Sequence, residues 1–115
     1  MIRIKRVYEP PAPDDGYRVL VDRLWPRGLT RKDAAIDAWL KELAPSTELR
    51  RWFGGEDASW REFARRYRNE LAAPELAPSL ADLRARARRG AVTLLYAKRD
   101  VQENNAVVLR DHLEA

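Results

Sequence analysis

Apolar and polar residues alternate with the period of a β-strand near the start of the chain, and two further stretches read as strands. Residues 2–7 alternate apolar with basic side chains, which is typical of a half-exposed strand. A second run covers residues 17–21, and a third, residues 91–97, is almost continuously apolar, as in a strand buried on both faces of a parallel sheet. The linker 9–16 is rich in turn formers and too short for a helical crossover, so the first two strands are either antiparallel or parallel through a compact loop.

Between these strands the apolar residues recur at helical spacing. The first predicted helix begins after Thr30, and Ile36, Trp39, Leu40 and Leu43 follow at i, i+3, i+4 and i+7 to form one apolar stripe. This pattern predicts an amphipathic helix whose stripe packs on the sheet.

Further helices are predicted from their capping residues. Ser46 and Ser59 are expected to begin the second and third helices, a fourth ends at Gly90, and Asn104 or Asn105 caps the last. We therefore expect one α/β domain, residues 1–115, with a small, mostly parallel sheet of about three strands covered by about five helices.

Composition narrows the function classes. Apolar residues make up 45% of the chain and charged residues 35%, and no apolar run approaches the roughly 20 residues needed to span a bilayer. No secretory segment follows the N-terminus, so we expect a cytoplasmic protein without a membrane partner. The chain has no cysteine and one histidine, His112, too few for a metal cluster or a histidine-based triad, so neither a metal nor a cofactor is expected.

Two strands end in charged residues. Asp22 and Arg23 follow the second strand, and Lys98, Arg99 and Asp100 follow the third. In a parallel sheet such ends converge, together with helix N-termini, where ligands usually bind. The candidate ligand-binding residues are Asp22, Arg23, Trp25, Arg27, Lys98, Arg99 and Asn104.

These residue types favour an anionic ligand such as a phosphate, a carboxylate or a sugar phosphate. Arg23 and Arg27 would clamp the anion bidentately, and Asp22 or Asp100 would hold a hydroxyl, orient an arginine or act as a base. The alternative is that Asp22 and Arg23 form structural ion pairs that fix the Trp25 turn. Catalytic residues, and whether the protein is an enzyme, stay open at this point.

A second hypothesis concerns the basic helices. The chain has 22 basic and 18 acidic residues, a formal net charge of +4, and the arginines in 61–68 and 84–89 are a candidate phosphate-tracking surface. Clustered basic helices are more often solvated faces, so nucleic-acid binding is not the favoured reading. A homodimer or protein-interaction module is the third alternative.

Several motifs together resemble a known family. They are Arg18-Val-Leu-Val-Asp-Arg-Leu-Trp-Pro-Arg-Gly28, Trp39 to Leu49, Trp52-Phe-Gly54, Phe63 with Arg66-Tyr67, Val92 to Ala97, and Asn104 to Leu109. Over nearly the whole chain they resemble the YeaO-like branch of the Domain of Unknown Function 488 family. The resemblance implies a small cytoplasmic α/β protein without an established activity, whose shared elements are residues 22–28 and the loop after the last strand.

The chain departs from this family in ways that bear on chemistry. Family members often carry a histidine where Gly55 stands and another where Glu103 stands, and this chain has neither. More distant members place a Cys-His-Arg element after the last strand, near Asn104 and Asn105 here. A binding role for the pocket is therefore more compatible with this sequence than a mechanism that needs histidine or a thiol.

Overall fold

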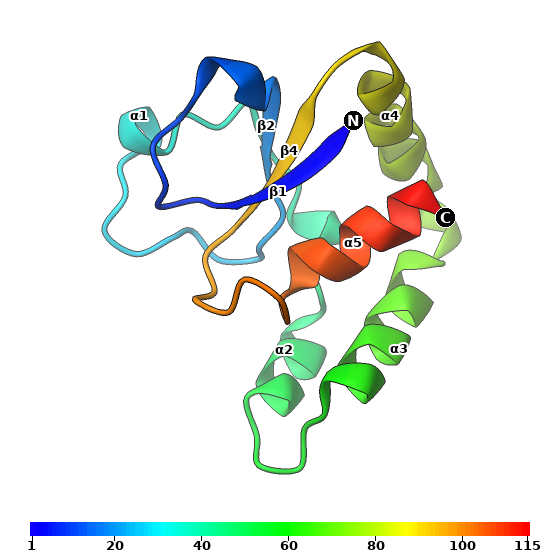
Figure 1. Ribbon diagram of the computed structural model, residues 1–115. Helices are drawn as coiled ribbons and strands as arrows, with labels where there is room; N and C mark the ends of the chain where they lie inside the picture. Colours follow the sequence, from blue (N-terminus) through cyan, green and yellow to red (C-terminus); the bar gives the residue numbers. More distant parts are fainter.

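Four parallel strands form the sheet of this protein, whose computed structural model describes residues 1–115 (Figure 1). The strands are β1 (Ile2–Arg6), β2 (Tyr17–Leu20), β3 (Ala38–Trp39) and β4 (Val92–Tyr96). The α-helices are α1 (Arg31–Ala34), α2 (Thr47–Phe53), α3 (Trp60–Leu71), α4 (Ala77–Arg89) and α5 (Asn105–Glu114). Short 3-10 helices cover Pro13–Asp15, Lys41–Leu43 and Pro74–Leu76. The predicted α/β class and parallel sheet are confirmed, with one strand more than expected.

The last strand in the chain lies in the middle of the sheet. The order is β1-β4-β2-β3, and β4 pairs in parallel with β1 on one side and β2 on the other. All five residues of β4 are buried, as its continuous apolar sequence predicts. β4 lies between β1 and β2, so the short 7–16 connection passes over the width of one strand. β1 and β2 run parallel to each other, because each pairs in parallel with β4. This order places the carboxyl ends of β2 and β4 next to each other.

Three helices begin at the predicted capping residues. The side-chain oxygens of Ser46, Ser59 and Asn104 each accept a backbone N–H from the first turn of α2, α3 and α5. Gly54 and Gly90 follow the ends of α2 and α4. The longest helix has 13 residues, and no helix combines the length and the apolar composition that crossing a membrane requires.

The predicted helix after Thr30 is wrong for most of its length. Thr30 does cap a helix, but α1 ends at Ala34, and Ala35 adopts a left-handed conformation with φ 49°. The chain then forms β3, in which Trp39 packs on one face of the sheet while Leu40 packs against the main core on the other. Neighbouring side chains thus alternate between faces, so the apparent helical stripe belongs to a strand and its flanks.

The two faces of the sheet are covered differently. Helices α3, α4 and α5 gather on one side, while α1 and the 7–16 loop lie on the other (Figure 1). The helical side holds the main core, to which β4 contributes Val92, Leu94 and Tyr96. The opposite side has a small apolar cluster of Val7, Leu20, Ala34 and Leu95.

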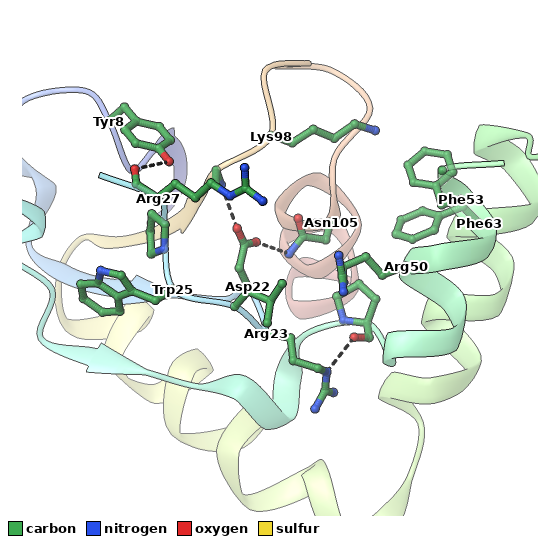
Figure 2. Close-up of a pocket in the computed structure, with 15 residues that line it drawn as sticks. Tyr8, Asp22, Arg23, Trp25, Arg27, Arg50, Phe53, Phe63, Lys98 and Asn105 are labelled. Carbon is green, nitrogen blue, oxygen red and sulfur yellow. Dashed lines mark hydrogen bonds between the residues drawn. The ribbon is translucent and has the colours of Figure 1, made fainter. Parts of the chain in front are cut away.

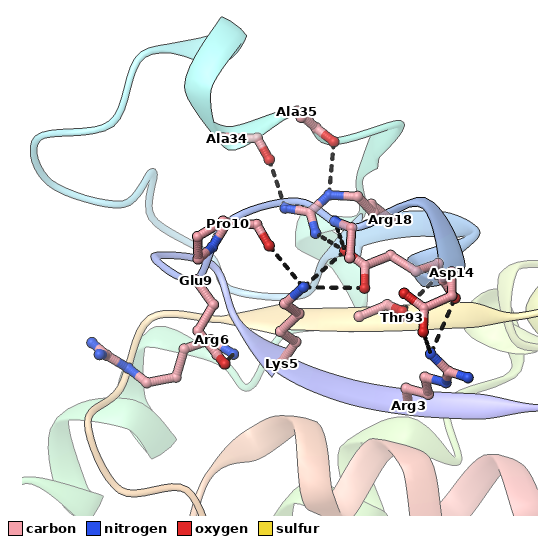
Figure 3. A network of polar contacts seen from close by, with 12 residues as sticks. Arg3, Lys5, Arg6, Glu9, Pro10, Asp14, Arg18, Ala34, Ala35 and Thr93 are labelled. Atoms are coloured by element: carbon pink, nitrogen blue, oxygen red, sulfur yellow. Dashed lines mark hydrogen bonds and ion pairs between the residues drawn. The ribbon is translucent and has the colours of Figure 1, made fainter.

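A polar network completes the second face of the sheet (Figure 3). The buried carboxylate of Asp15 accepts hydrogen bonds from Lys5 Nζ at 3.1 Å and pairs with the buried guanidinium of Arg18. Arg18 also donates to two carbonyls at the end of α1, and Thr93 Oγ1 donates to the Asp15 carbonyl at 2.7 Å. Burial alone would raise the pKa of Asp15, but the Ala12 amide and these two cations outweigh burial and lower it. This network ties β1, β2 and β4 to the loops that cover them.

Candidate functional site

A pocket of about 490 Å³ opens at the carboxyl edge of the sheet (Figure 2). The ends of β2 and β4 are held together there, since Val21 N donates to the Leu95 carbonyl at 3.1 Å and Ala97 N donates to Asp22 Oδ2 at 2.9 Å. The expected adjacency of the two strand ends is therefore confirmed. The lining residues are Tyr8, Asp22, Arg23, Leu24, Trp25, Pro26, Arg27, Pro45, Arg50, Phe53, Gly54, Phe63, Ala97, Lys98 and Asn105.

Five of the seven residues predicted for this site line the pocket: Asp22, Arg23, Trp25, Arg27 and Lys98. Arg99 is exposed and lies outside the lining. Asn104 is buried and serves as the cap of α5, where its amide nitrogen donates to the Asp100 carbonyl at 2.9 Å. Its neighbour Asn105 lines the pocket instead. That these residues bind a ligand stays a prediction.

Asp22 is half-buried at the base of the pocket and bonds to two other segments. Its Oδ2 accepts from Ala97 N at 2.9 Å and its Oδ1 accepts from Asn105 Nδ2 at 3.1 Å. Burial raises the pKa of Asp22 above its ordinary value, although both hydrogen bonds and the charge of Arg50 oppose the rise. Neither Asp22 nor Arg23 forms an ion pair within 4.0 Å, so the alternative in which both form structural ion pairs is wrong.

Arg23 is bound to the wall of the pocket. Its Nε donates to the Pro45 carbonyl at 3.2 Å and its Nη2 to the Ala44 carbonyl at 3.4 Å. Figure 2 shows its guanidinium pointing away from Asp22. The side chain thus fixes the segment that precedes α2, which is a structural role.

Trp25 is held by the turn that it belongs to. Its indole Nε1 donates to the Leu29 carbonyl at 2.7 Å, and its ring packs edge-on against Trp39 with centroids 5.3 Å apart. Trp39 Nε1 in turn donates to the Asp22 carbonyl at 2.7 Å. The two indoles therefore brace the turn that carries Arg27.

Three other cations face the pocket without an acidic partner. Arg27, Arg50 and Lys98 form no ion pair within 4.0 Å, and the side chains of Arg27 and Arg50 donate no hydrogen bond within the protein. Lys98 Nζ donates to the Glu103 carbonyl at 2.8 Å. Figure 2 shows these side chains extending from three different segments around Asp22 and Asn105. Such a group of unpaired charges at a concave surface creates a positive potential.

An aromatic pair forms the wall opposite Trp25. Phe53 stacks on Phe63 with ring centroids 4.1 Å apart, and Lys98 Nζ lies 4.0 Å from the Phe53 ring centroid. Burial lowers the pKa of Lys98, and the nearby carboxylates of Asp100 and Glu103 oppose that change. Lys98 therefore bridges the loop after β4 and the end of α2 across the pocket.

Ten of the fifteen lining residues were not among the predicted site residues, and the polar and aromatic ones from helices are Arg50, Phe53, Phe63 and Asn105. Arg50, Phe53 and Phe63 come from α2 and α3, which the chain order does not place near strand ends. Tyr8 also lines the pocket, and this residue carried a usable signal, because it follows β1 at the same edge of the sheet.

The lining is poor in residues that commonly act in catalysis. Asp22 is the one carboxylate that lines the pocket, and no serine, threonine, cysteine or histidine joins it. The side chains of the lining that can transfer a proton are therefore Asp22, Tyr8 and Lys98. No group of three or more acidic or histidine side chains is placed to hold a metal ion.

Three of the eight helical arginines proposed as a nucleic-acid surface form ion pairs, and a fourth, Arg84, donates to backbone carbonyls. Arg65 and Arg66 both pair with Glu62 at 2.7 Å on α3, and Arg86 pairs with Asp82 at 2.9 Å on α4. Each pairing reduces the charge that a helix presents to a phosphate backbone. Nucleic-acid binding by these helices stays a prediction.

Comparisons with known proteins place this geometry in a family context. A family model described as "Inactive DUF488-N3 subclade" matches residues 1–115. "Uncharacterized protein YeaO" of Escherichia coli strain K12 is 47% identical over 115 residues, which is 99% of this chain and 97% of the relative. "Uncharacterized protein Rv3073c" of Mycobacterium tuberculosis and "Uncharacterized protein Mb3100c" of Mycobacterium bovis are each 44% identical over 108 residues, 94% of this chain and 89% of each relative. No solved structure matches significantly.

Proposed function

Because the chain belongs to the inactive DUF488-N3 subclade, we propose that its pocket binds a small anionic, nucleotide-like ligand and does not transform it. The observation that carries this proposal is the unpaired state of Arg27, Arg50 and Lys98 around one cavity. Cations without partners repel one another, so an anion that binds between them relieves that repulsion. Arginine also offers a planar fork of donors that matches carboxylate and phosphate oxygens.

The size and walls of the pocket support an organic anion in preference to a bare ion. A volume of about 490 Å³ lies within the range of small-molecule sites. Trp25, Phe53 and Phe63 give it apolar walls on two sides, so the ligand's carbon skeleton has surface to bury. A binding protein needs charged donors and apolar walls, and the lining has both.

Isothermal titration calorimetry at low ionic strength tests the proposal. The probes are inorganic phosphate, ribose 5-phosphate and AMP, each titrated into the wild-type protein. We expect an organic phosphate to bind more tightly than inorganic phosphate. We expect Arg27→Ala and Arg50→Ala each to weaken that binding by about tenfold or more, because each removes charged donors from the anion.

Arg99→Ala is the matched control, because it removes the same charge from an exposed residue outside the lining. It should leave the affinity within about twofold of wild type, because its side chain lies outside the lining and makes no hydrogen bond to an anion bound there. The proposal fails if no probe binds to the wild type. It also fails if Arg99→Ala weakens binding as much as Arg50→Ala, because the attraction would then be non-specific.

The nucleic-acid alternative predicts a different response. Binding of an oligonucleotide through the arginines of α3 and α4 would weaken by orders of magnitude between about 50 and 200 mM salt. Fluorescence anisotropy with a labelled oligonucleotide measures this dependence. Oligonucleotide binding that survives Arg27→Ala and Arg50→Ala but follows this salt dependence would assign the function to the helices.

A further inference from the structure

The amide orientation of Asn105 is fixed by its partners. Its Nδ2 donates to the Val21 carbonyl at 2.9 Å and to Asp22 Oδ1 at 3.1 Å, so both amide hydrogens are used. Rotating the amide by half a turn would place its oxygen against these two acceptors, which is unfavourable. The Asn105 Oδ1 atom accepts no hydrogen bond from the protein, and Figure 2 shows the residue facing the pocket beside Asp22.

The base of the pocket consequently differs in character from its rim. Asn105 Oδ1 and the carboxylate of Asp22 are both acceptors, and neither offers a hydrogen to a ligand. A phosphate or carboxylate placed there would face oxygen atoms and be repelled. The anionic group of a ligand therefore belongs with Arg27, Arg50 and Lys98, and the part that reaches the base must carry a donor.

We propose that Asn105 is a specificity-determining residue whose Oδ1 accepts a hydrogen bond from a ligand hydroxyl, so that the ligand is a phosphate ester of a hydroxylated sugar. This inference rests on the proposed function, because it assumes that the same pocket binds an anion. The ring face of Phe53 is flanked by Phe63 and by Lys98, so the sugar phosphate, and not a stacked base, makes the selective contacts.

The test compares two ligands of equal charge and chain length. Ribose 5-phosphate carries hydroxyls, whereas pentyl phosphate carries none and is more apolar. We expect the wild type to bind ribose 5-phosphate about tenfold more tightly by calorimetry, because pentyl phosphate leaves the Asn105 Oδ1 acceptor without a donor. Equal affinities, or tighter binding of pentyl phosphate, would overturn the inference. Because this comparison uses the wild type, it does not depend on the folding of any variant.

Asn105→Ala then assigns the preference to the residue. The variant should bring the affinity ratio of the two ligands close to one, while Gln102→Ala, which removes an exposed amide outside the pocket, should keep the wild-type ratio. A folded Asn105→Ala variant that keeps the full preference would overturn the assignment. AMP distinguishes two sources of the sugar phosphate. Binding as tight as that of ribose 5-phosphate means that the pocket accepts the sugar phosphate of a nucleotide, and weaker binding means that it selects a free sugar phosphate.

The two proposals fail in different ways. If no phosphate binds, the proposed function and this inference both fail. If ribose 5-phosphate and pentyl phosphate bind equally, and Arg50→Ala weakens the binding of both, the pocket is an anion site. In that case only the inference that Asn105 recognises a ligand hydroxyl is wrong.

Discussion

Asp22 joins three segments that are far apart in the sequence. It follows the end of β2, accepts the Ala97 amide after β4, and accepts the Asn105 side-chain amide at the start of α5. Each carboxylate oxygen meets a donor, so the residue satisfies groups that would otherwise lie unpaired near the base of the pocket. Its charge therefore has a structural use in addition to shaping the pocket.

Asp22→Asn tests this use with almost no change in shape. The asparagine keeps one acceptor oxygen, but its NH₂ group must face either the Ala97 amide or the Asn105 amide, both of which are donors. We expect the free energy of unfolding to fall by about 1–3 kcal/mol, the usual cost of an unsatisfied buried group. Urea denaturation followed by tryptophan fluorescence measures it.

Asp100→Asn is the matched control for this substitution. Asp100 is exposed, and a single oxygen, Oδ1, accepts both the Gln102 and Glu103 amides. Asparagine can keep that oxygen in place, so the change should stay within about 0.5 kcal/mol. Equal losses in the two variants would show that Asp22 has no special structural role.

Single residues at the strand ends could be predicted, but their partners could not. Asp22 and Lys98 were found because charge follows an apolar strand, and parallel strands converge at one edge. Arg50 and Phe53 reach the pocket from α2, and no rule of spacing relates α2 to a strand end. Whether Asn104 or Asn105 lines the pocket depends on which side-chain amide faces it. The sequence cannot decide this, because the start of a helix is predicted only to within one or two residues.

Helix starts with a side-chain cap are the elements that sequence predicts well. Ser46, Ser59 and Asn104 each offer an oxygen to an unpaired N–H, a local interaction that does not depend on the rest of the fold. β3 was missed for the opposite reason. It has two residues, and its place beside β2 depends on contacts with a strand almost 20 residues earlier. Tertiary pairing there overrides a helical spacing of apolar residues.

Ala35 is the residue at which the predicted helix fails, and it offers a test. Its φ of 49° is left-handed and its side chain is exposed. The left-handed conformation costs a residue with a Cβ atom about 1–2 kcal/mol. Replacing alanine with glycine removes this cost, but part of the gain in stability is lost because the unfolded chain has more conformational freedom with glycine. We expect Ala35→Gly to raise the free energy of unfolding by about 0.5–1 kcal/mol in urea denaturation.

Ala72 provides the control, because it follows α3 in a right-handed conformation with φ −79° and is also exposed. Ala72→Gly should lower the free energy of unfolding by about 0.5–1 kcal/mol, because glycine makes the unfolded chain more flexible and relieves no strain in the folded protein. If both variants lose stability equally, the left-handed turn at Ala35 is not what ends α1.

Five carboxylates have shifted pKa values in the folded protein, and the shifts have opposite effects on stability. Asp14, Asp15, Glu62 and Asp100 have lowered pKa values in the folded protein, whereas burial raises that of Asp22. The hydrogen bonds of Arg65 and then Arg66 lower the pKa of Glu62 to about 2. Lowered groups outnumber the raised one, and they lie on the network face, on α3 and on the loop after β4.

We therefore expect the protein to lose stability in acid. A carboxylate with a lowered folded-state pKa takes up its proton more readily when unfolded, so its stabilisation is complete above the unfolded pKa and is lost as pH falls through the folded pKa. Asp22 acts in the opposite sense, because its folded form is protonated first. Urea midpoints measured from about pH 6 down to about pH 2 should fall steadily below about pH 5.

The position of each pair decides how salt changes this acid response. The Glu62 pairs are exposed and should be screened, whereas the Asp15 network is buried and should not be. In about 1 M NaCl, where the Debye length is about 3 Å, the urea midpoint of Glu62→Gln should fall with pH as steeply as that of wild type. The midpoint of Asp15→Asn should fall less steeply than that of wild type both in low salt and in about 1 M NaCl. A slope that disappears in salt for the wild type would mean that exposed pairs, and not the network beneath the loops, carry the pH dependence of this fold.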